Sequence, residues 1–275
     1  MIYSIQKASL TKRISAFLFD VMMIVVVFLV CALSMSAILG YSNYTQEKDM
    51  IQASILEKYN IEALEEKYAD IEGANFIHYN NLSVEEKTAF ENNEDLPEEL
   101  RKNFKDCLDE INSNEEIATL TGTMFSLFVT IFSTSLLFAF IILEFIVPLL
   151  FKNGQTLGKK IFSLGVVRID SVKVSPLVLF VRTILGKYTI SAMVPLISFC
   201  WFTLLPSITP LFFILLILLL HIVFYFTSGI GALIHDKMAA TAVVDMQTQM
   251  IFDSVEALEE YKLQVHREEV EKADY

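Results

Sequence analysis

Cysteine is scarce in this sequence, and its spacing excludes two common kinds of structural site. The 275 residues contain Cys31, Cys107 and Cys200, an odd number with wide separations. This pattern matches neither a disulfide framework nor the closely spaced ligands of a zinc site. We read the three as small buried hydrophobic side chains and one unpaired thiol, and we predict no metal site.

The residue sets of an enzyme active site are also missing. No nucleophile–base set and no cofactor loop is recognisable. The stretch Gly154-Gln-Thr-Leu-Gly158-Lys159-Lys160 is similar to a phosphate loop, but three residues rather than four separate its glycines, and no serine or threonine follows the lysine. These glycines are better explained as the point where the chain turns sharply away from a membrane. We therefore predict neither enzymatic activity nor a cofactor.

Charged residues are nearly absent from four long stretches. Hydrophobic residues make up 54% of the chain, and the mean hydropathy is +0.50. A helix of ~20 apolar residues crosses the ~30 Å hydrocarbon core of a bilayer. The first stretch is too long for the apolar part of a signal peptide and contains Asp20, so we read it as a retained anchor. The predicted spans are Ile14–Gly40, Gly122–Phe151, Tyr188–Leu205 and Ile208–Ser228.

The charges are segregated along the chain, although they sum to −12. Residues 41–121 hold seven Lys/Arg and twenty Asp/Glu, whereas residues 152–187 hold seven Lys/Arg and one acid. Because basic loops favour the cytoplasmic side, both termini and residues 152–187 are predicted to be cytoplasmic, and residues 41–121 to lie outside. A tight outer turn is expected from Pro206 to Pro210. The basic segment is short and flanked by spans, so we expect it to contact anionic lipid headgroups, not nucleic acid.

Residues 41–121 are predicted to form a small helical ectodomain. Apolar residues recur at helical spacing from Gln46 to Ile71, Ser83-Val-Glu-Glu86 is a capping box, and Pro97 begins a helix that ends near Asn112. One face of this last helix is apolar and consists of Leu100, Phe104, Cys107 and Leu108. Two interpretations remain open: a docking surface for an extracytoplasmic partner or cations, and a solvated acidic insertion.

Short β-branched segments follow the second and fourth spans. Leu164–Ile169, Val172–Ser175 and Thr241–Met246 are predicted to be strands that pair beneath the membrane, because a two-stranded ribbon is marginal alone. Leu177–Lys187 suits an interfacial helix. The tail from Asp253 to Tyr275 is either a charged helix or disordered.

Three polar motifs accompany the spans. Arg13 precedes the first span and Asp20 lies within it; the stretch 154–167 follows the second; and His235-Asp236-Lys-Met-Ala-Ala-Thr-Ala-Val-Val244 follows the last. As a set over about 1–40 and 120–246, they resemble the RDD family of small polytopic membrane proteins. The resemblance assigns the family's arginine and two aspartates to Arg13, Asp20 and Asp236. It implies a membrane domain for which transport, including cation/proton exchange, has been suggested, and it supplies no catalytic residues.

Two features depart from the family pattern. A glycine that is usual near Ala240 is absent, which affects the turn into the following strand. The acidic segment 41–121 is far longer than the usual first loop, so it is particular to this protein.

Asp20, Glu144 and His221 interrupt three of the apolar stretches at similar depth. Counted from the predicted cytoplasmic ends at 1.5 Å per residue, all three lie ~10 Å into the membrane. Such groups are costly in hydrocarbon and need a partner, a cavity or a function. Three interpretations remain open: an ion or proton site formed by all three, structural locking by hydrogen bonds or ion pairs, and a pocket for a small ligand or lipid headgroup. For Asp20 and Glu144, the locking partners would be Ser15, Thr183, Tyr188, backbone groups or Arg182.

Around this layer we expect an ion pair between Arg13 and Asp236 at the cytoplasmic mouth. Supporting residues are Arg182, Gly154, Gly158, Lys159 and His235.

The sequence therefore predicts an all-α membrane protein: a four-helix transmembrane bundle with a helical acidic extracytoplasmic insertion and a small cytoplasmic β-element. The expected function is transport of a small solute, or exchange of a cation for protons, in the cell membrane by a homo-oligomer, because four spans enclose little volume. The alternative is a non-enzymatic scaffold or accessory subunit that docks partners. The expected parts are residues 1–40, 41–121, 122–151, 152–187, 188–228 and 229–275.

Overall fold

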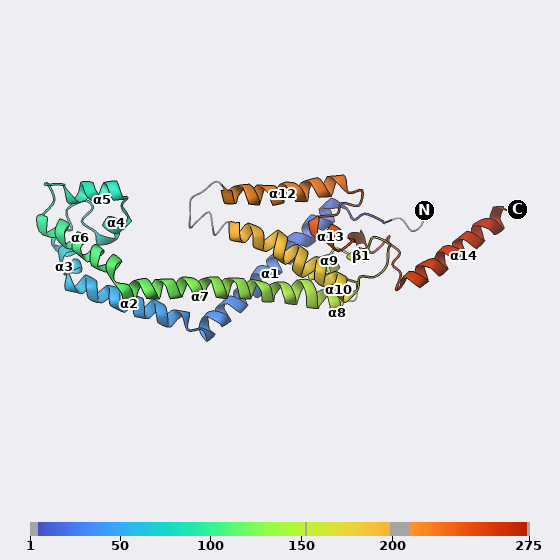
Figure 1. Cartoon of the computed structure of the whole chain (residues 1–275), viewed down its shortest axis with the longest axis horizontal. Coiled ribbons are helices and arrows are strands. Elements are labelled where there is room, and N and C mark those ends of the chain that lie inside the picture. Colours follow the sequence, from blue (N-terminus) through green and yellow to red (C-terminus); the bar gives the residue numbers. More distant parts are fainter. Residues whose placement is uncertain (1–4, 152, 199–208, 274–275) are drawn as a thin grey trace. The chain divides into compact units, whose positions relative to one another are not determined.

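A computed structural model of the chain describes residues 5–151, 153–198 and 209–273. Within them, four helices are long and apolar enough to cross a membrane (Figure 1), as the sequence predicted. They are Leu10–Ile38 (α1), Glu115–Leu150 (α7, η1 and α8), Pro176–Ser198 (α10, η2 and a last helical segment) and Thr209–Thr227 (α12). Cys200 and most of the predicted turn from Pro206 to Pro210 lie outside the described residues.

The chain divides into two compact units, and each is described by itself. One unit comprises Ala32–Ser133, and the other comprises Met1–Cys31 with Thr134–Tyr275. The discontinuous unit contains α10, η2, α12 and the small sheet. It also contains Asp20, Glu144 and His221, the three residues predicted to form an ion or proton site. We call it the membrane unit, and the other the helical unit.

The third apolar helix begins earlier than the sequence indicated. An interfacial helix from Leu177 to Lys187 and a separate span from Tyr188 were predicted, but one continuous helix begins at Pro176 and extends through Ser198, the last described residue of this segment. Arg182 and Lys187 lowered the apparent hydropathy of its first half. Both side chains have acidic partners in the fold, so one helix accommodates them.

Two of the apolar helices contain wide π-helical turns. In the second, Ile141–Ile146 (η1) precedes Val147–Leu150 (α8), which contains Pro148. Proline lacks an N–H, and its ring crowds the carbonyl four residues earlier, here that of Glu144. The Thr183 hydroxyl donates to this carbonyl over 3.0 Å from the neighbouring Val181–Met193 (η2), which is also π-helical. A backbone group released by proline is thus satisfied by the next helix.

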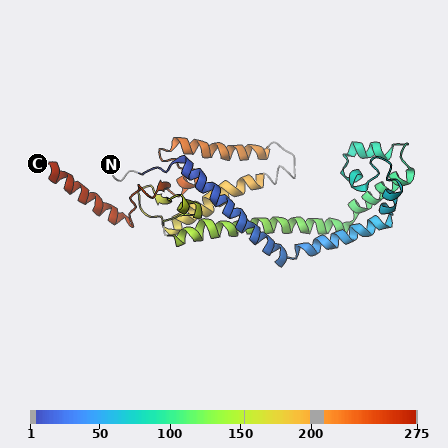
Figure 2. The ribbon, with the colours of Figure 1, turned by 180° about the vertical axis from the view of Figure 1, so that it is seen from behind.

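The small sheet is an antiparallel pair. Leu164–Arg168 (β1) and Thr241–Asp245 (β2) pair with Val166 opposite Val243. The short helices Leu157–Ile161 (α9) and Ile234–Met238 (α13) precede the two strands. Both views of the ribbon show these elements together at one end of the apolar helices (Figures 1 and 2). The predicted third strand, Val172–Ser175, contributes only isolated bridges, including Lys173 opposite Val167, so two strands of the three are confirmed.

Ala240, directly before β2, has a left-handed backbone with a φ of 48°. A Cβ is unfavourable in this conformation, which a glycine would adopt without strain. We predict that Ala240→Gly raises the free energy of unfolding by about 0.5–1 kcal/mol. Circular dichroism during denaturant titration in micelles measures this change. Ala239→Gly is the matched control, because Ala239 has a φ of −97° and should lose stability as glycine. A lower stability for Ala240→Gly would contradict the strain argument.

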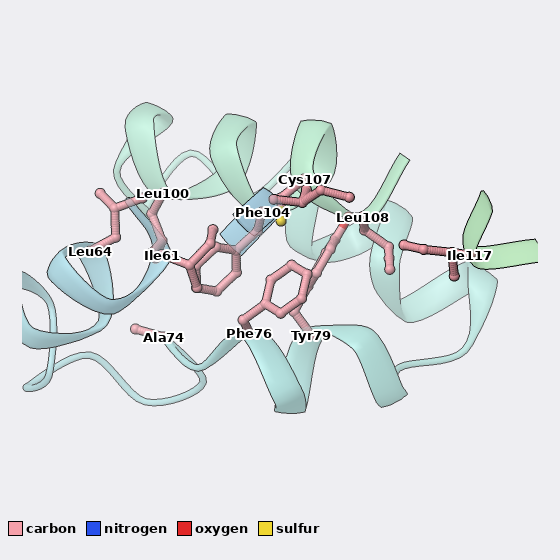
Figure 3. Packing of buried hydrophobic residues seen from close by; sticks show 11 residues of the cluster. Ile61, Leu64, Ala74, Phe76, Tyr79, Leu100, Phe104, Cys107, Leu108 and Ile117 are labelled. Atoms are coloured by element: carbon pink, nitrogen blue, oxygen red, sulfur yellow. The ribbon is translucent and has the colours of Figure 1, made fainter. Parts of the chain in front are cut away.

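The helical unit has a core of its own (Figure 3). Phe104 packs edge-on against Phe76, with ring centroids 5.5 Å apart, and lies 5.8 Å from Tyr79. The predicted capping box is present, with the Ser83 hydroxyl accepting from the Glu86 N–H. The helices are Tyr41–Lys58 (α2), Ile61–Lys67 (α3), Phe76–Asn81 (α4), Val84–Glu91 (α5) and Glu98–Ser113 (α6). On α6 the predicted apolar face is confirmed, since its buried residues are Leu100, Phe104, Cys107 and Leu108.

Of the two alternatives for the C-terminal tail, the helix is observed. It extends from Val255 to Ala273 (α14). Phe252 and Leu258, on either side of its beginning, pack with Val172 in a small buried cluster.

Candidate functional site

Six charged side chains from five helical segments form a buried layer in the membrane unit. They come from α1, η1, η2 and the two short helices α9 and α13. We call them the charged layer: Asp20, Glu144, Lys159, Arg182, Lys187 and Asp236. Five of the six residues are less than a tenth exposed, and the Lys187 side chain is 16% exposed.

Asp20 is held by the segment that follows the second span. One carboxylate oxygen accepts from the Thr156 hydroxyl over 2.5 Å, and the other accepts from the Gly158 N–H over 2.8 Å. A side chain at Gly158 would overlap the Ala16 carbonyl of α1, so only glycine permits this close approach. Among the described residues Asp20 makes no direct ion pair. Its charge is met by hydrogen-bond donors alone.

Glu144 and Lys187 form a second element of the layer. The Lys187 ammonium donates to a Glu144 carboxylate oxygen over 2.6 Å, and the Glu144 side chain is 5% exposed. The Glu144 carbonyl also accepts a hydrogen bond from Thr183, so both the side chain and the backbone of residue 144 contact η2. Thr183 was one of the predicted locking partners, although it contacts the backbone of Glu144 and not its carboxylate.

Arg182 and Asp236 form the most buried pair. The Arg182 Nε and Nη2 atoms donate to one Asp236 oxygen over 3.0 and 2.5 Å, and the other oxygen accepts from the Leu233 N–H over 3.1 Å. The side chains are 2% and 1% exposed. Burial alone would raise the pKa of Asp236, but the Arg182 guanidinium lowers it well below its ordinary range. This carboxylate is therefore held ionised.

The predicted pair between Arg13 and Asp236 is wrong. Arg13 donates to the Gly231 carbonyl over 2.6 Å and lies over the Tyr225 ring, 5.9 Å from its centroid. Asp236 takes Arg182 as its partner because η2 packs closely on α13. A side chain at Gly186 would come within 2.6 Å of the His235 Cβ, so the missing Cβ brings Arg182 within reach of Asp236. The suggested pairing of Arg182 with Asp20 or Glu144 is wrong for the same reason.

Lys159 has no carboxylate within ion-pairing distance among the described residues. Its Nζ lies 3.3 Å from the Thr156 hydroxyl oxygen. Burial lowers the pKa of Lys159 to about 7, and the positive charge of Lys187 acts in the same direction, while Glu144 and Asp20 oppose them. An amine with this pKa is present in both protonation states near neutral pH.

His221 lies beside a second histidine, and its hydrogen bonds go to groups other than the two carboxylates with which it was grouped. Its Nδ1 lies 2.8 Å from the Ile217 carbonyl and its Nε2 lies 3.1 Å from the Ser191 hydroxyl. Its ring centroid is 6.5 Å from that of His235. Burial lowers the pKa of His235 to about 3, so this ring is neutral at physiological pH, and its Nδ1 has no hydrogen-bond partner within the described chain.

The geometry therefore brings two of the three predicted residues to a shared lysine. Asp20 reaches Lys159 through Thr156, and Glu144 lies close enough to influence the same amine electrostatically. Their role as an ion or proton site remains a prediction. Sequence reasoning missed Thr156 and the pairing of Lys187, although both lie in the stretches that it singled out. Within the described residues no group of three His, Cys, Asp or Glu side chains is placed to hold a metal ion.

Comparison with known proteins gives one match. The model of the RDD family matches residues 116–240, which contain Glu144, Lys159, Arg182, Lys187 and Asp236. Arg13 and Asp20 lie before the matched region. No curated protein and no solved structure matches the chain. Residues 116–240 carry three of the four apolar helices and most of the charged layer, and over this part the chain is similar to the RDD family of membrane proteins.

Proposed function

We propose that this protein moves protons across the membrane in exchange for a cation or another small solute, with Asp20 as the carboxylate that takes up the proton. The observation that carries this proposal is the difference between Asp20 and the other two buried carboxylates. Glu144 and Asp236 each contact a basic side chain directly, whereas Asp20 contacts a hydroxyl and an N–H. Because Asp20 is not part of an ion pair, loss of its charge would leave no buried cation without a partner.

The two buried ion pairs near Asp20 would hold the helices around such a site in a fixed arrangement. Breaking a buried ion pair leaves an uncompensated charge, so Arg182–Asp236 and Glu144–Lys187 favour a single arrangement of η1, η2 and α13. Asp20 comes from α1 and contacts the segment before α9 through two hydrogen bonds. Uptake of a proton by Asp20 would weaken its bond to the Gly158 N–H, because a neutral carboxyl group is a poorer acceptor. Protonation would then weaken one of the two hydrogen bonds between α1 and the segment before α9.

Reconstitution of the purified protein into liposomes that contain a pH-sensitive dye tests the proposal. Addition of a series of monovalent cations on one side should move protons only in liposomes that contain the protein, and only for some of the cations. A scaffold or accessory subunit, the alternative function, would carry no flux with any cation. The separate core of the helical unit supports that alternative, because it gives residues 41–121 a defined surface on which a partner could dock.

For the orientation we propose the arrangement indicated by the charges, in the cell membrane, with both termini and the basic segment in the cytoplasm. The basic residues of that segment would then contact anionic headgroups, and residues 41–121 would lie outside. In intact cells, a membrane-impermeant maleimide should label Glu94→Cys, whereas Arg267→Cys should react only after lysis. Both positions are exposed. The parent chain controls for labelling of the native cysteines, and the opposite labelling pattern would reverse the orientation.

A further inference from the structure

Thr156 lies between the buried amine of Lys159 and the buried carboxylate of Asp20. Its hydroxyl oxygen is 2.5 Å from Asp20 Oδ2 and 3.3 Å from Lys159 Nζ. Thr156 is 2% exposed, and Asp20 and Lys159 are 8% and 7% exposed, so bulk water has little access to these three side chains. The three groups form a continuous line of hydrogen-bonding atoms from α9 to α1.

The direction of each hydrogen bond follows from which groups can donate. A threonine hydroxyl has one hydrogen to donate and two lone pairs to accept. Its two nitrogen neighbours, the Lys159 backbone N–H at 3.4 Å and the ammonium, can only donate. The hydroxyl hydrogen must therefore point to Asp20, which accepts it as an ionised carboxylate.

When the proton is on Asp20 and not on Lys159, all three groups can still be hydrogen-bonded. A neutral Lys159 amine has a lone pair and accepts the Thr156 hydroxyl hydrogen, while a protonated Asp20 donates its own hydrogen to the Thr156 oxygen. Both states satisfy the same three groups without movement of the backbone. A proton relay requires two such states, both fully hydrogen-bonded, that differ only in which group carries the proton.

From this geometry we propose that Thr156 relays a proton between Lys159 and Asp20, so that Lys159 is the group that loads and unloads the carboxylate. This proposal rests on the function proposed above. In the forward step the N–H bond of the Lys159 ammonium breaks and its proton joins Thr156 Oγ1. At the same time the Thr156 O–H bond breaks and that proton joins Asp20 Oδ2. The products are a neutral amine, a carboxylic acid and an unchanged hydroxyl, and no other reactant is needed.

The charges around Lys159 are compatible with both states. The groups that act on it are Asp20 of α1, Glu144 of η1, Arg182 and Lys187 of η2, and His235 of α13. Arg182 and Lys187 disfavour the ammonium, whereas Glu144 and Asp20 favour it. Since His235 is neutral, these opposing charges and burial leave the pKa of Lys159 at about 7, close to the pH at which a transporter must bind and release protons.

A pair of variants at Thr156 tests the relay directly. Thr156→Val keeps the shape of the side chain and removes the hydroxyl, and Thr156→Ser keeps the hydroxyl. In liposomes, Thr156→Val should reduce proton flux about tenfold or more, and Thr156→Ser should stay within about twofold of the parent protein. Gel filtration and circular dichroism show that both variants are folded. Flux in folded Thr156→Val equal to that of the parent would overturn the relay.

Lys159 gives a second test that a purely structural role would not pass. The parent flux should have an inflection near pH 7, and Lys159→Arg should remove this inflection, because arginine stays protonated. An unchanged pH profile in Lys159→Arg would count against the relay.

A measurement that needs no transport separates the relay from the proposed function. The parent protein, labelled with ¹³C-lysine, is titrated in micelles by NMR, and the Lys159 signal is identified by its loss in Lys159→Met. Titration near pH 7 supports the relay even if liposomes show no flux, a result that would reject the proposed function alone. Titration near the ordinary value of 10.5 would overturn the relay even if flux is present.

Discussion

Replacement of Asp20 by asparagine is expected to abolish proton flux in liposomes while the protein still folds. Asparagine has nearly the same shape, and its amide oxygen can still accept from the Gly158 N–H while its NH₂ group donates to the Thr156 oxygen. The contact between α1 and the segment before α9 therefore survives. An amide cannot take up a proton at physiological pH, so the rate should fall by about 100-fold or more, to that of protein-free liposomes. The assay is dye-reported proton movement after addition of a monovalent cation.

Asp253→Asn is the matched control for this experiment. It also converts an aspartate to asparagine, but its side chain is 81% exposed and its partner is Lys173, outside the charged layer. Its flux should equal that of the parent. A folded Asp20→Asn protein that retains full flux would remove Asp20 from the transport path and with it the proposed function.

Replacement of Asp236 by asparagine is expected to destabilise the protein more than any other conservative change in the charged layer. Arg182 would remain buried without a negative partner, since both of its hydrogen bonds to a side chain go to one Asp236 oxygen. Loss of one partner of a buried pair costs about 3–5 kcal/mol, because the remaining charge is uncompensated. The free energy of unfolding, followed by circular dichroism during denaturant titration in micelles, measures this loss.

Two further variants show whether the lost charge is the cause. Arg182→Met combined with Asp236→Leu removes both charges and should recover most of the stability, because apolar replacements of a buried ion pair are often neutral or stabilising. Glu99→Gln removes one partner of the exposed Lys67–Glu99 pair and should leave the unfolding transition unchanged. A double variant as unstable as Asp236→Asn would show that packing, not charge, dominates at this site.

Much of the architecture followed from local features of the sequence. The length of each apolar run predicted a membrane-crossing helix, because transfer of apolar side chains from water is nearly additive along the chain. The Ser83 capping box and the apolar face of α6 were equally readable, since each depends on residues within a few positions of one another. The start of the third span was misplaced because hydropathy counts Arg182 and Lys187 as polar whether or not they have partners.

The partners within the charged layer were decided by the tertiary structure. Arg182 and Asp236 are 54 residues apart, and Thr156 and Asp20 are 136 residues apart. Nothing in the order of the residues states that Gly158 lets α9 approach α1, or that Gly186 lets η2 approach α13, because such fits depend on surfaces that exist only after the helices pack. The sequence by itself determined which segments are apolar enough to cross a membrane and which ionisable residues lie in or beside them. Only the packed structure determined which of those charges neutralise one another, because ion pairs and hydrogen bonds act over a few ångströms in space and not along the chain.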